Sequence, residues 1–345
     1  MSRYPSILAL ALLAILTGPA GAALAQGPAP VAQAPPAVAQ QPPAEPTGPV
    51  GEFAGTAHVA WVLVPVVVRR PGGYVTDLER SDFRLWIDGE RVTPADFEAG
   101  GDAPLSLVLL QDLSGSMANG GKLEASRRAL AYVLGQARAG DELALATFAG
   151  GRLSVDVPFT TDTGVLAEAM ALWEGYGTTA LHDAVSRIPE IGEAARRGKR
   201  AVVLVTDGVD NASTVAPEAA RAMVRQSSVP VYVLGLGRDR IGSVSTPEQA
   251  PAATWGHLLR RLASETGGRY YPVRHPRDIE SAVADLVREL RSQYVLFFPT
   301  APGPRVPRSV RVDVDVAGRA EVYHRPGYVG GPPTAARSTT EQGGP

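Results

Sequence analysis

Cysteine is absent from the 345 residues of this chain. Without cysteine the chain forms no disulfide, carries no lipid-modified cysteine and offers no thiolate to a metal ion. Its stability must therefore come from a buried apolar core, aided by any metal that it binds. The length allows two domains or one large domain, and hydrophobic residues make up 45% of the chain, so a sizeable core is available.

Histidine and clustered basic residues are also scarce. The chain has five histidines, none of them beside the polar cluster described below, and it has no Gly-x-Ser-x-Gly motif. A hydrolase needs a nucleophile or a general base at the reacting group, and the sequence supplies no convincing one. Lysine and arginine are scattered and the net charge is −2, which excludes the basic surface that nucleic-acid binding requires.

The first 25 residues have the pattern of a signal peptide. Arg3 is their only charge, residues 7–16 are an apolar core too short to span a bilayer, and Ala-Leu-Ala at 23–25 is a small-x-small cleavage signal. Cleavage would leave a net charge of 32 − 35 = −3 and no membrane span. Together with the missing disulfides, this predicts an exported bacterial protein, periplasmic or extracellular. The alternative is that the segment is retained as an anchor.

Proline dominates the next segment. Residues 26–50 contain eight prolines and a single charge, Glu45. We interpret residues 26–52 as a semi-rigid, disordered linker that extends at most ~3 Å per residue, or alternatively as a passive leader. Residues 329–345 are also expected to be disordered.

Two β-rich segments flank the centre of the chain, at 53–100 and 293–328. Residues 61–68 are β-prone, with Pro65 indicating an edge strand or a bulge. Residues 83–92 alternate around Asp88-Gly89 as a hairpin, valines alternate over 310–316, and a proline-containing turn is expected at 305–308. Each segment has too few strands to be stable alone. We therefore predict that they pair into one β module; separate appendages are the alternative.

Between these segments, residues 104–292 alternate apolar strands with amphipathic helices. This pattern predicts a doubly wound α/β domain with a mainly parallel sheet and helices on both faces. Residues 153–157 are expected to pair with the preceding strand as a hairpin. The other expected strands are 105–110, 142–148, 201–206, 229–234 and 269–272, and the expected helices are 122–137, 163–173, 180–195, 217–226, 255–266 and 276–292.

Oxygen-bearing side chains follow the ends of these strands. Asp112-Leu-Ser114-Gly-Ser116 ends the first strand, Thr178-Thr179 lies in a glycine-rich loop, and Asp207 follows the strand at 201–206. Because ligands of doubly wound sheets lie at the carboxyl ends of strands, these groups are expected to converge. Two carboxylates and several hydroxyls suit Mg²⁺ or Mn²⁺ and disfavour zinc and copper. A site for permanent storage of the ion would be expected to carry three or more acids, so a partner's carboxylate could complete this one.

The pattern Asp112-x-Ser114-x-Ser116, followed by Thr179 and Asp207, resembles the metal-ion-dependent adhesion site of von Willebrand factor type A domains. The resemblance covers about 104–292, and the flanking segments are similar to those of a bacterial exported subgroup. It implies a divalent cation, Mg²⁺ or alternatively Mn²⁺ or Ca²⁺, and a ligand Asp or Glu that completes its shell. Gly177-Thr178 replaces the more usual Gly-Gly, so Thr178 is the alternative to Thr179. The implied metal ligands are Asp112, Ser114, Ser116, Thr179 and Asp207.

The leading hypothesis is a non-enzymatic, metal-dependent module for adhesion or protein interaction. The alternatives are a metal-assisted hydrolase and a structural or assembly component of the envelope with a vestigial site. Nearby polar residues have simpler interpretations as loop, capping or packing residues, although Asp183 could also orient the site, and Asp210 and Asn211 could also support its ligands. These residues are His182, Asp183, Asp210 and Asn211, and the Gly235-Leu-Gly237 loop is interpreted as a flexible strand end.

Overall fold

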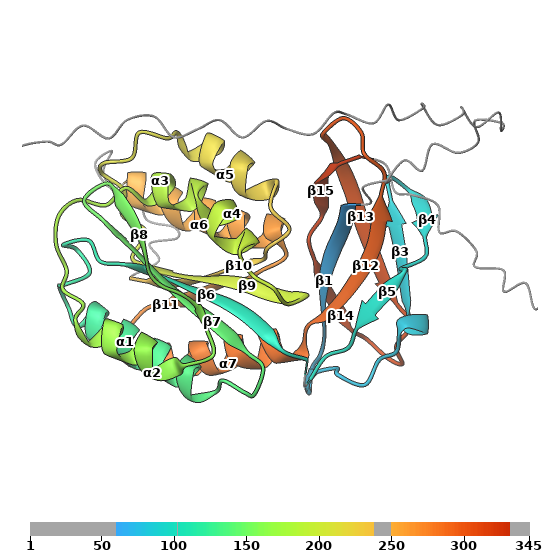
Figure 1. Ribbon diagram of the computed structural model, residues 1–345, viewed down its shortest axis with the longest axis horizontal. Coiled ribbons are helices and arrows are strands. Elements are labelled where there is room, and N and C mark those ends of the chain that lie inside the picture. Colours follow the sequence, from blue (N-terminus) through green and yellow to red (C-terminus); the bar gives the residue numbers. More distant parts are fainter. Residues whose placement is uncertain (1–59, 102, 238–249, 332–345) are drawn as a thin grey trace, which may run out of the picture. The chain divides into compact units, whose positions relative to one another are not determined.

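The computed structural model describes residues 60–101, 103–237 and 250–331, of which residues 250–255 are described by their backbone alone. The predicted signal peptide and proline-rich linker, and residues 332–345 of the predicted tail, lie outside this range. Between its first and last described strands, the chain forms an α/β domain and a β module (Figure 1).

A six-stranded sheet forms the centre of the α/β domain, in the order β11-β10-β9-β6-β7-β8. Neighbouring strands are parallel except β8, which returns antiparallel to β7 through a hairpin at Gly150 and Gly151. The predicted mainly parallel sheet and its hairpin are confirmed. The strands are β6 (Leu105–Asp112), β7 (Glu142–Ala149), β8 (Arg152–Thr160), β9 (Lys199–Thr206), β10 (Val231–Leu236) and β11 (Tyr270–Val273).

Helices cover both faces of this sheet (Figure 1). Alternate residues of β6 enter two different cores: Leu107 and Leu109 pack on one face, and Val108 and Leu110 on the other. The first face carries α1 (Lys122–Gly135), α2 (Thr163–Ala171) and α7 (Ile279–Ser292), and the second carries α3 (Leu181–Ser186), α4 (Ile188–Glu193), α5 (Pro217–Arg225) and α6 (Ala250–Thr266).

No helix among the described residues is long and apolar enough to cross a membrane.

The single helix expected over 180–195 is wrong. The chain forms two short helices, α3 and α4, which meet at Arg187. Pro189 lies at the start of α4, where its missing N–H costs little. Inside a continuous helix the same proline would remove a hydrogen bond and clash with the preceding turn, so the helix ends before it. A short 3₁₀ turn, Pro276–Asp278, likewise precedes α7.

The two flanking segments pair with each other, as predicted. One sheet has the order β14-β1-β12-β5 with β2 on β1, and the other has the order β15-β13-β3-β4. They share an apolar core that includes Val64, Leu85 and Phe298. The strands are β1 (Ala60–Arg70), β2 (Gly73–Tyr74), β3 (Phe83–Ile87), β4 (Glu90–Val92), β5 (Asp96–Glu98), β12 (Tyr294–Thr300), β13 (Val306–Val314), β14 (Glu321–His324) and β15 (Gly327–Gly330), and a 3₁₀ turn spans Arg80–Asp82.

Three details of the β module differ from expectation. Strand β1 lies between β12 and β14 rather than at an edge, but Pro65 precedes the stretch that pairs with β14. The turn expected at 305–308 is instead the start of β13, where Pro307 pairs only with β15. At each proline the strand pairs with only one neighbouring strand. No hydrogen bond to a second strand is therefore lost where the proline lacks its N–H. Strand β15 also continues to Gly330, two residues beyond the predicted end.

Candidate metal centre

The register of the central sheet brings the two candidate carboxylates to the same edge. Strands β6 and β9 are parallel neighbours, with Gln111 opposite Val205. Asp112 is the last residue of β6, and Asp207 comes directly after Thr206, the last residue of β9. The predicted convergence of these two strand ends is therefore present, although 95 residues (207 − 112) separate the carboxylates in the chain.

Asp112 is fully buried and held by two hydrogen bonds. Its Oδ1 accepts from the backbone N–H of Ser114 at 2.9 Å, and its Oδ2 accepts from the Thr206 hydroxyl at 2.7 Å. Burial raises the pKa of Asp112 from 3.8 to about 6, although both hydrogen bonds favour the ionised form. Thr206 thus positions Asp112. The local sequence pattern does not indicate this role, apart from the hydroxyl directly before Asp207.

The two serines lie side by side after β6. Their Oγ atoms are 3.2 Å apart, and the Ser114 side chain is buried. Gly115, between them, donates its N–H to the carbonyl of Gly177 at 3.1 Å. Both hydroxyls therefore lie next to each other, and the loop that contains them contacts the threonine loop.

The threonine loop, residues 175–179, packs against the segment that follows β6. Tyr176 donates its N–H to the Leu113 carbonyl at 2.8 Å. A side chain at Gly175 would come within 2.8 Å of the Ala118 Cβ, and Gly177 has a positive φ of 66°. Glycine is thus required at both positions by close approach or by backbone conformation.

Within this loop, Thr179 is buried and Thr178 is exposed. Asn211 holds Thr179 through two bonds: its Oδ1 accepts from the Thr179 N–H at 2.8 Å, and its own N–H donates to the Thr179 carbonyl at 3.0 Å. Asn211 is therefore more than a loop residue, because it ties the segment after β9 to the threonine loop. Thr179 remains the preferred candidate ligand, since it lies inside this hydrogen-bonded framework.

Asp207 forms an ion pair with a residue that lies far from it in the sequence. Lys122, the first residue of α1, places its Nζ 2.6 Å from the Asp207 Oδ2 and 3.1 Å from the Ser116 carbonyl oxygen. The Asp207 side chain is 3% exposed and that of Lys122 is 25% exposed. The second candidate carboxylate thus already faces a positive charge from the chain itself.

The remaining polar residues near the site form hydrogen bonds that hold the loop after β9 in place. Asp183 accepts hydrogen bonds from the N–H groups of Thr214 and Val215 at 3.0 and 2.8 Å. Asp210 accepts from the His182 N–H at 3.1 Å, and its Oδ2 lies 3.4 Å from the His182 Nδ1. Burial lowers the pKa of His182 and favours the neutral ring. These contacts join the loop after β9 to the start of α3, so the structural interpretation fits all three residues.

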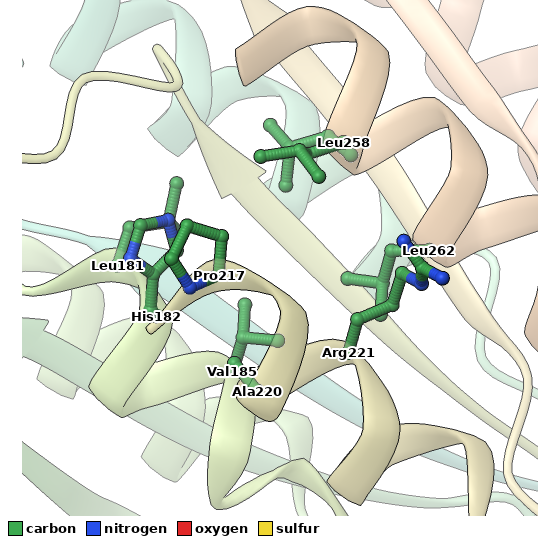
Figure 2. Close-up of a pocket in the computed structure, with 9 residues that line it drawn as sticks. Leu181, His182, Val185, Pro217, Ala220, Arg221, Leu258 and Leu262 are labelled. Atoms are coloured by element: carbon green, nitrogen blue, oxygen red, sulfur yellow. The ribbon is translucent and has the colours of Figure 1, made fainter. Parts of the chain in front are cut away.

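A narrow apolar pocket lies between α3, α5 and α6 (Figure 2). Its volume of about 20 Å³ is enough for roughly one water molecule. Leu181, Leu258 and Leu262 line it, and none of the five candidate metal ligands does. The pocket is therefore part of the helix packing and not of the candidate metal centre.

Comparison with known families agrees with this geometry. Residues 107–209 match the von Willebrand factor type A domain. The chain contains a von Willebrand factor type A (VWA) domain. The matched segment runs from β6 to just beyond Asp207 and includes all five candidate ligands, whereas the flanking β module lies outside it. No curated protein sequence matches the chain.

Solved structures resemble the chain at low sequence identity. A von Willebrand factor type A protein from Catenulispora acidiphila is 16% identical over 70% of this chain and 71% of that chain, with a TM-score of 0.47. An aerotolerance-related membrane protein from Bacteroides fragilis, with multiple mutations to serine, is 21% identical. The match covers 54% of this chain and 98% of that protein, with a TM-score of 0.43. Proximal thread matrix protein 1 from the mussel byssus is 15% identical, with a TM-score of 0.46. The match covers 64% of this chain and 50% of that protein, so this chain spans about half of its length.

The residues at this edge of the VWA domain fit a hard divalent cation. Asp112 is buried and forms no ion pair among the described residues, so its charge lacks a counterion. The other candidate groups offer oxygen, which Mg²⁺, Mn²⁺ and Ca²⁺ prefer. The described part of the chain has no cluster of three or more His, Cys, Asp or Glu residues arranged for a metal. A cation here would therefore rely on hydroxyl groups as well as on the two carboxylates.

Proposed function

We propose that the VWA domain is a non-enzymatic protein-binding module that holds a divalent cation and receives an acidic residue from a partner. Mg²⁺ is the proposed ion, with Mn²⁺ or Ca²⁺ as alternatives. The observation that carries the proposal is the buried Asp112 carboxylate, which forms no ion pair within the described part of the chain, beside the pair of serine hydroxyls. The proposed ligands are Asp112, Ser114, Ser116, Thr179 and Asp207.

Charge supports a carboxylate as the partner group. Asp112 and Asp207 contribute −2, a divalent ion would contribute +2, and Lys122 contributes +1, which sums to +1 at the loaded site. Opposite charge on the partner steers encounter and suppresses wrong partners. An Asp or Glu side chain would neutralise this charge, and its oxygen is also a suitable ligand for the ion.

Exposed apolar side chains near the site support contact with a protein. Tyr176, in the threonine loop, is 58% exposed, and Val209, two residues after Asp207, is 40% exposed. Aromatic side chains at the centre of an interface contribute much of its binding energy. A partner that presents an acidic residue among apolar neighbours would use both features. We further propose, from the first 25 residues, that the protein acts in the periplasm or outside the cell.

Metal binding is tested by calorimetry and thermal unfolding with MgCl₂. Wild-type protein should bind Mg²⁺ and unfold at a higher temperature in its presence, because a ligand that binds only the folded state stabilises it. Asp112→Asn and Asp207→Asn should both lose this response. Asp313→Asn, which removes an exposed carboxylate from β13, should retain it. An unchanged response in Asp112→Asn would contradict the assignment of the ligands, and no response in wild-type protein would favour the vestigial-site alternative.

The non-enzymatic part needs a separate assay. In the described structure, the histidine near the site, His182, faces Asp210. Protein incubated with Mg²⁺ and p-nitrophenyl phosphate should release no product above the buffer rate. Turnover that disappears in Asp207→Ala would support the hydrolase alternative instead.

A further inference from the structure

Lys122 contacts the carboxylate that the proposed ion needs. Its Nζ lies 2.6 Å from the Asp207 Oδ2 and 3.1 Å from the carbonyl oxygen of Ser116. Asp207 and Ser116 are both proposed metal ligands. A divalent cation bound to Asp207 and an ammonium group at hydrogen-bond distance from the same carboxylate would repel each other strongly.

The position of Lys122 is not explained by the helix that it begins. Lys122 is the first residue of α1, and its backbone follows Gly121, which has a positive φ of 71°. The amino end of a helix carries a partial positive charge, which disfavours a cation and favours an acid such as Glu124 in the same turn. The ion pair with Asp207, whose side chain is 3% exposed, therefore compensates for the unfavourable position of a cation at the amino end of α1.

The choice of lysine is also unusual for this chain. Lys122 and Lys199 are its two lysines, which leaves 33 − 2 = 31 arginines. An ammonium group is a compact point charge on a flexible stem, whereas a guanidinium group is a planar fork that favours a fixed bidentate pairing. Lysine is thus the basic side chain that can approach a carboxylate as a small cation does and then withdraw.

We propose that Lys122 is a tethered cation that competes with the divalent ion for Asp207 and is displaced toward solvent when the ion binds. This inference rests on the proposed function of the site. Lys122 lowers the affinity for the metal, because the ion must break an existing ion pair. It also keeps the site from holding two unpaired carboxylates when metal is scarce. After displacement, the ammonium group remains beside the loaded site and adds to its attraction for an acidic partner.

A substitution that keeps the stem and removes the charge tests the competition. In the full chain, Lys122→Met should bind Mg²⁺ at least about tenfold more tightly than wild-type protein, as expected for the loss of one charged competitor. Without metal it should unfold at a lower temperature, because Asp207 loses its counterion. The matched control is Arg128→Met, which removes a positive charge from the same helix where the side chain faces Glu124 and Glu280. This control should change the Mg²⁺ affinity by less than roughly twofold, since an exposed charge is screened.

Amine labelling measures the displacement itself. Lys122 should become more reactive toward acetic anhydride when MgCl₂ is added, as read by mass spectrometry of the two lysine peptides. Lys199 is the internal control, because its side chain is buried and its Nζ donates to the Arg291 carbonyl at 2.9 Å. Lys199 labelling should not respond to the metal.

The outcomes separate this inference from the proposed function. If wild-type protein binds Mg²⁺ through Asp112 but Lys122→Met binds no more tightly, the competition is wrong and the metal site stands. The same conclusion follows if Mg²⁺ binds without any rise in Lys122 labelling. If neither wild-type protein nor Lys122→Met binds Mg²⁺, the proposed function fails, and this inference fails with it.

Discussion

Asp112 and Asp207 show how similar side chains acquire different environments at adjacent strand ends. Asp112 is surrounded by hydroxyl and backbone donors and has no cationic partner among the described residues, whereas Asp207 is paired with Lys122. Burial disfavours the ionised form of Asp112, so a bound cation would offset this cost. Thr206 partly offsets the cost by donating a hydrogen bond.

The raised pKa of Asp112 predicts how pH acts on the metal-free protein. Its pKa of about 6 exceeds the ordinary 3.8, so its protonated form favours folding. This contribution is complete below about pH 4 and is lost as pH rises through 6, which amounts to about 3 kcal/mol. Asp112→Asn mimics the protonated form. Without metal it should therefore be more stable than wild-type protein at pH 8 and no more stable at pH 4, as measured by urea unfolding.

Metal binding should show the opposite pH dependence. The ion requires the carboxylate, so the rise in unfolding temperature caused by Mg²⁺ should be large at pH 8 and should shrink as pH falls below about 6. The same titration on Asp313→Asn should match wild-type protein. An Mg²⁺ response of equal size at pH 5 and pH 8 would contradict the assignment of Asp112.

The candidate site depends on how three loops are held together. The loop after β6 bonds to the threonine loop through Gly115 and Gly177, and the segment after β9 bonds to the same loop through Asn211. Each loop follows a different strand or helix, and none of them could fix the position of Thr179 alone. The hydrogen bonds among the loops therefore preorganise the proposed ligands before any ion arrives.

Asn211→Ala tests this preorganisation without touching a proposed ligand. It removes the acceptor for the Thr179 N–H, which should cost about 1 kcal/mol of folding free energy and weaken Mg²⁺ binding. The comparison variant is Asp162→Ala, which removes a similar acceptor at the start of α2, where Asp162 accepts from the Gly164 N–H at 2.9 Å. Calorimetry should find a lower Mg²⁺ affinity only in Asn211→Ala. Equal affinities in the two variants would mean that Asn211 does not position Thr179.

The β module needs both segments that flank the VWA domain. Strand β13 pairs with β3 over five residue pairs from Val310 to Val314, although more than 200 residues separate the two strands. Strands β1 and β12 pair in the same way across the inserted VWA domain. Val310 and Val312 enter the core that Leu85 and Ile87 also form, so this core exists only when both flanking segments are present.

Removal of the C-terminal strands should disrupt the core of the β module. A chain ending at residue 304 lacks β13, β14 and β15 and should expose the apolar face of β3, which would increase binding of the dye ANS and promote aggregation. A chain ending at residue 331 keeps every described strand and should behave as the full chain does. Size-exclusion chromatography and ANS fluorescence measure the difference. A monomeric 1–304 chain with unchanged ANS fluorescence would show that the module does not depend on its C-terminal strands.

The amino-acid sequence alone predicted the alternation of strands and helices, the pairing of the two flanking segments and the convergence of Asp112 with Asp207. These follow from periodicity, from turn residues and from the general rule that parallel strands end at one edge. The five metal ligands remain a prediction from the same patterns. Periodicity did not predict that the helix ends before Pro189. It also did not predict which strands lie beside Pro65 and Pro307. A local pattern does not show which backbone groups have a neighbour.

Only the tertiary structure identified Thr206, Asn211 and Lys122 as residues of the site. Thr206 and Asp112 are 94 residues apart in the chain, and Lys122 and Asp207 are 85 apart. No short-range pattern encodes such contacts, because they depend on which strands become neighbours and on where each side chain then points. The sequence thus predicted which oxygen groups the proposed site contains, and the packing of the chain decided what holds them and which charge already faces Asp207.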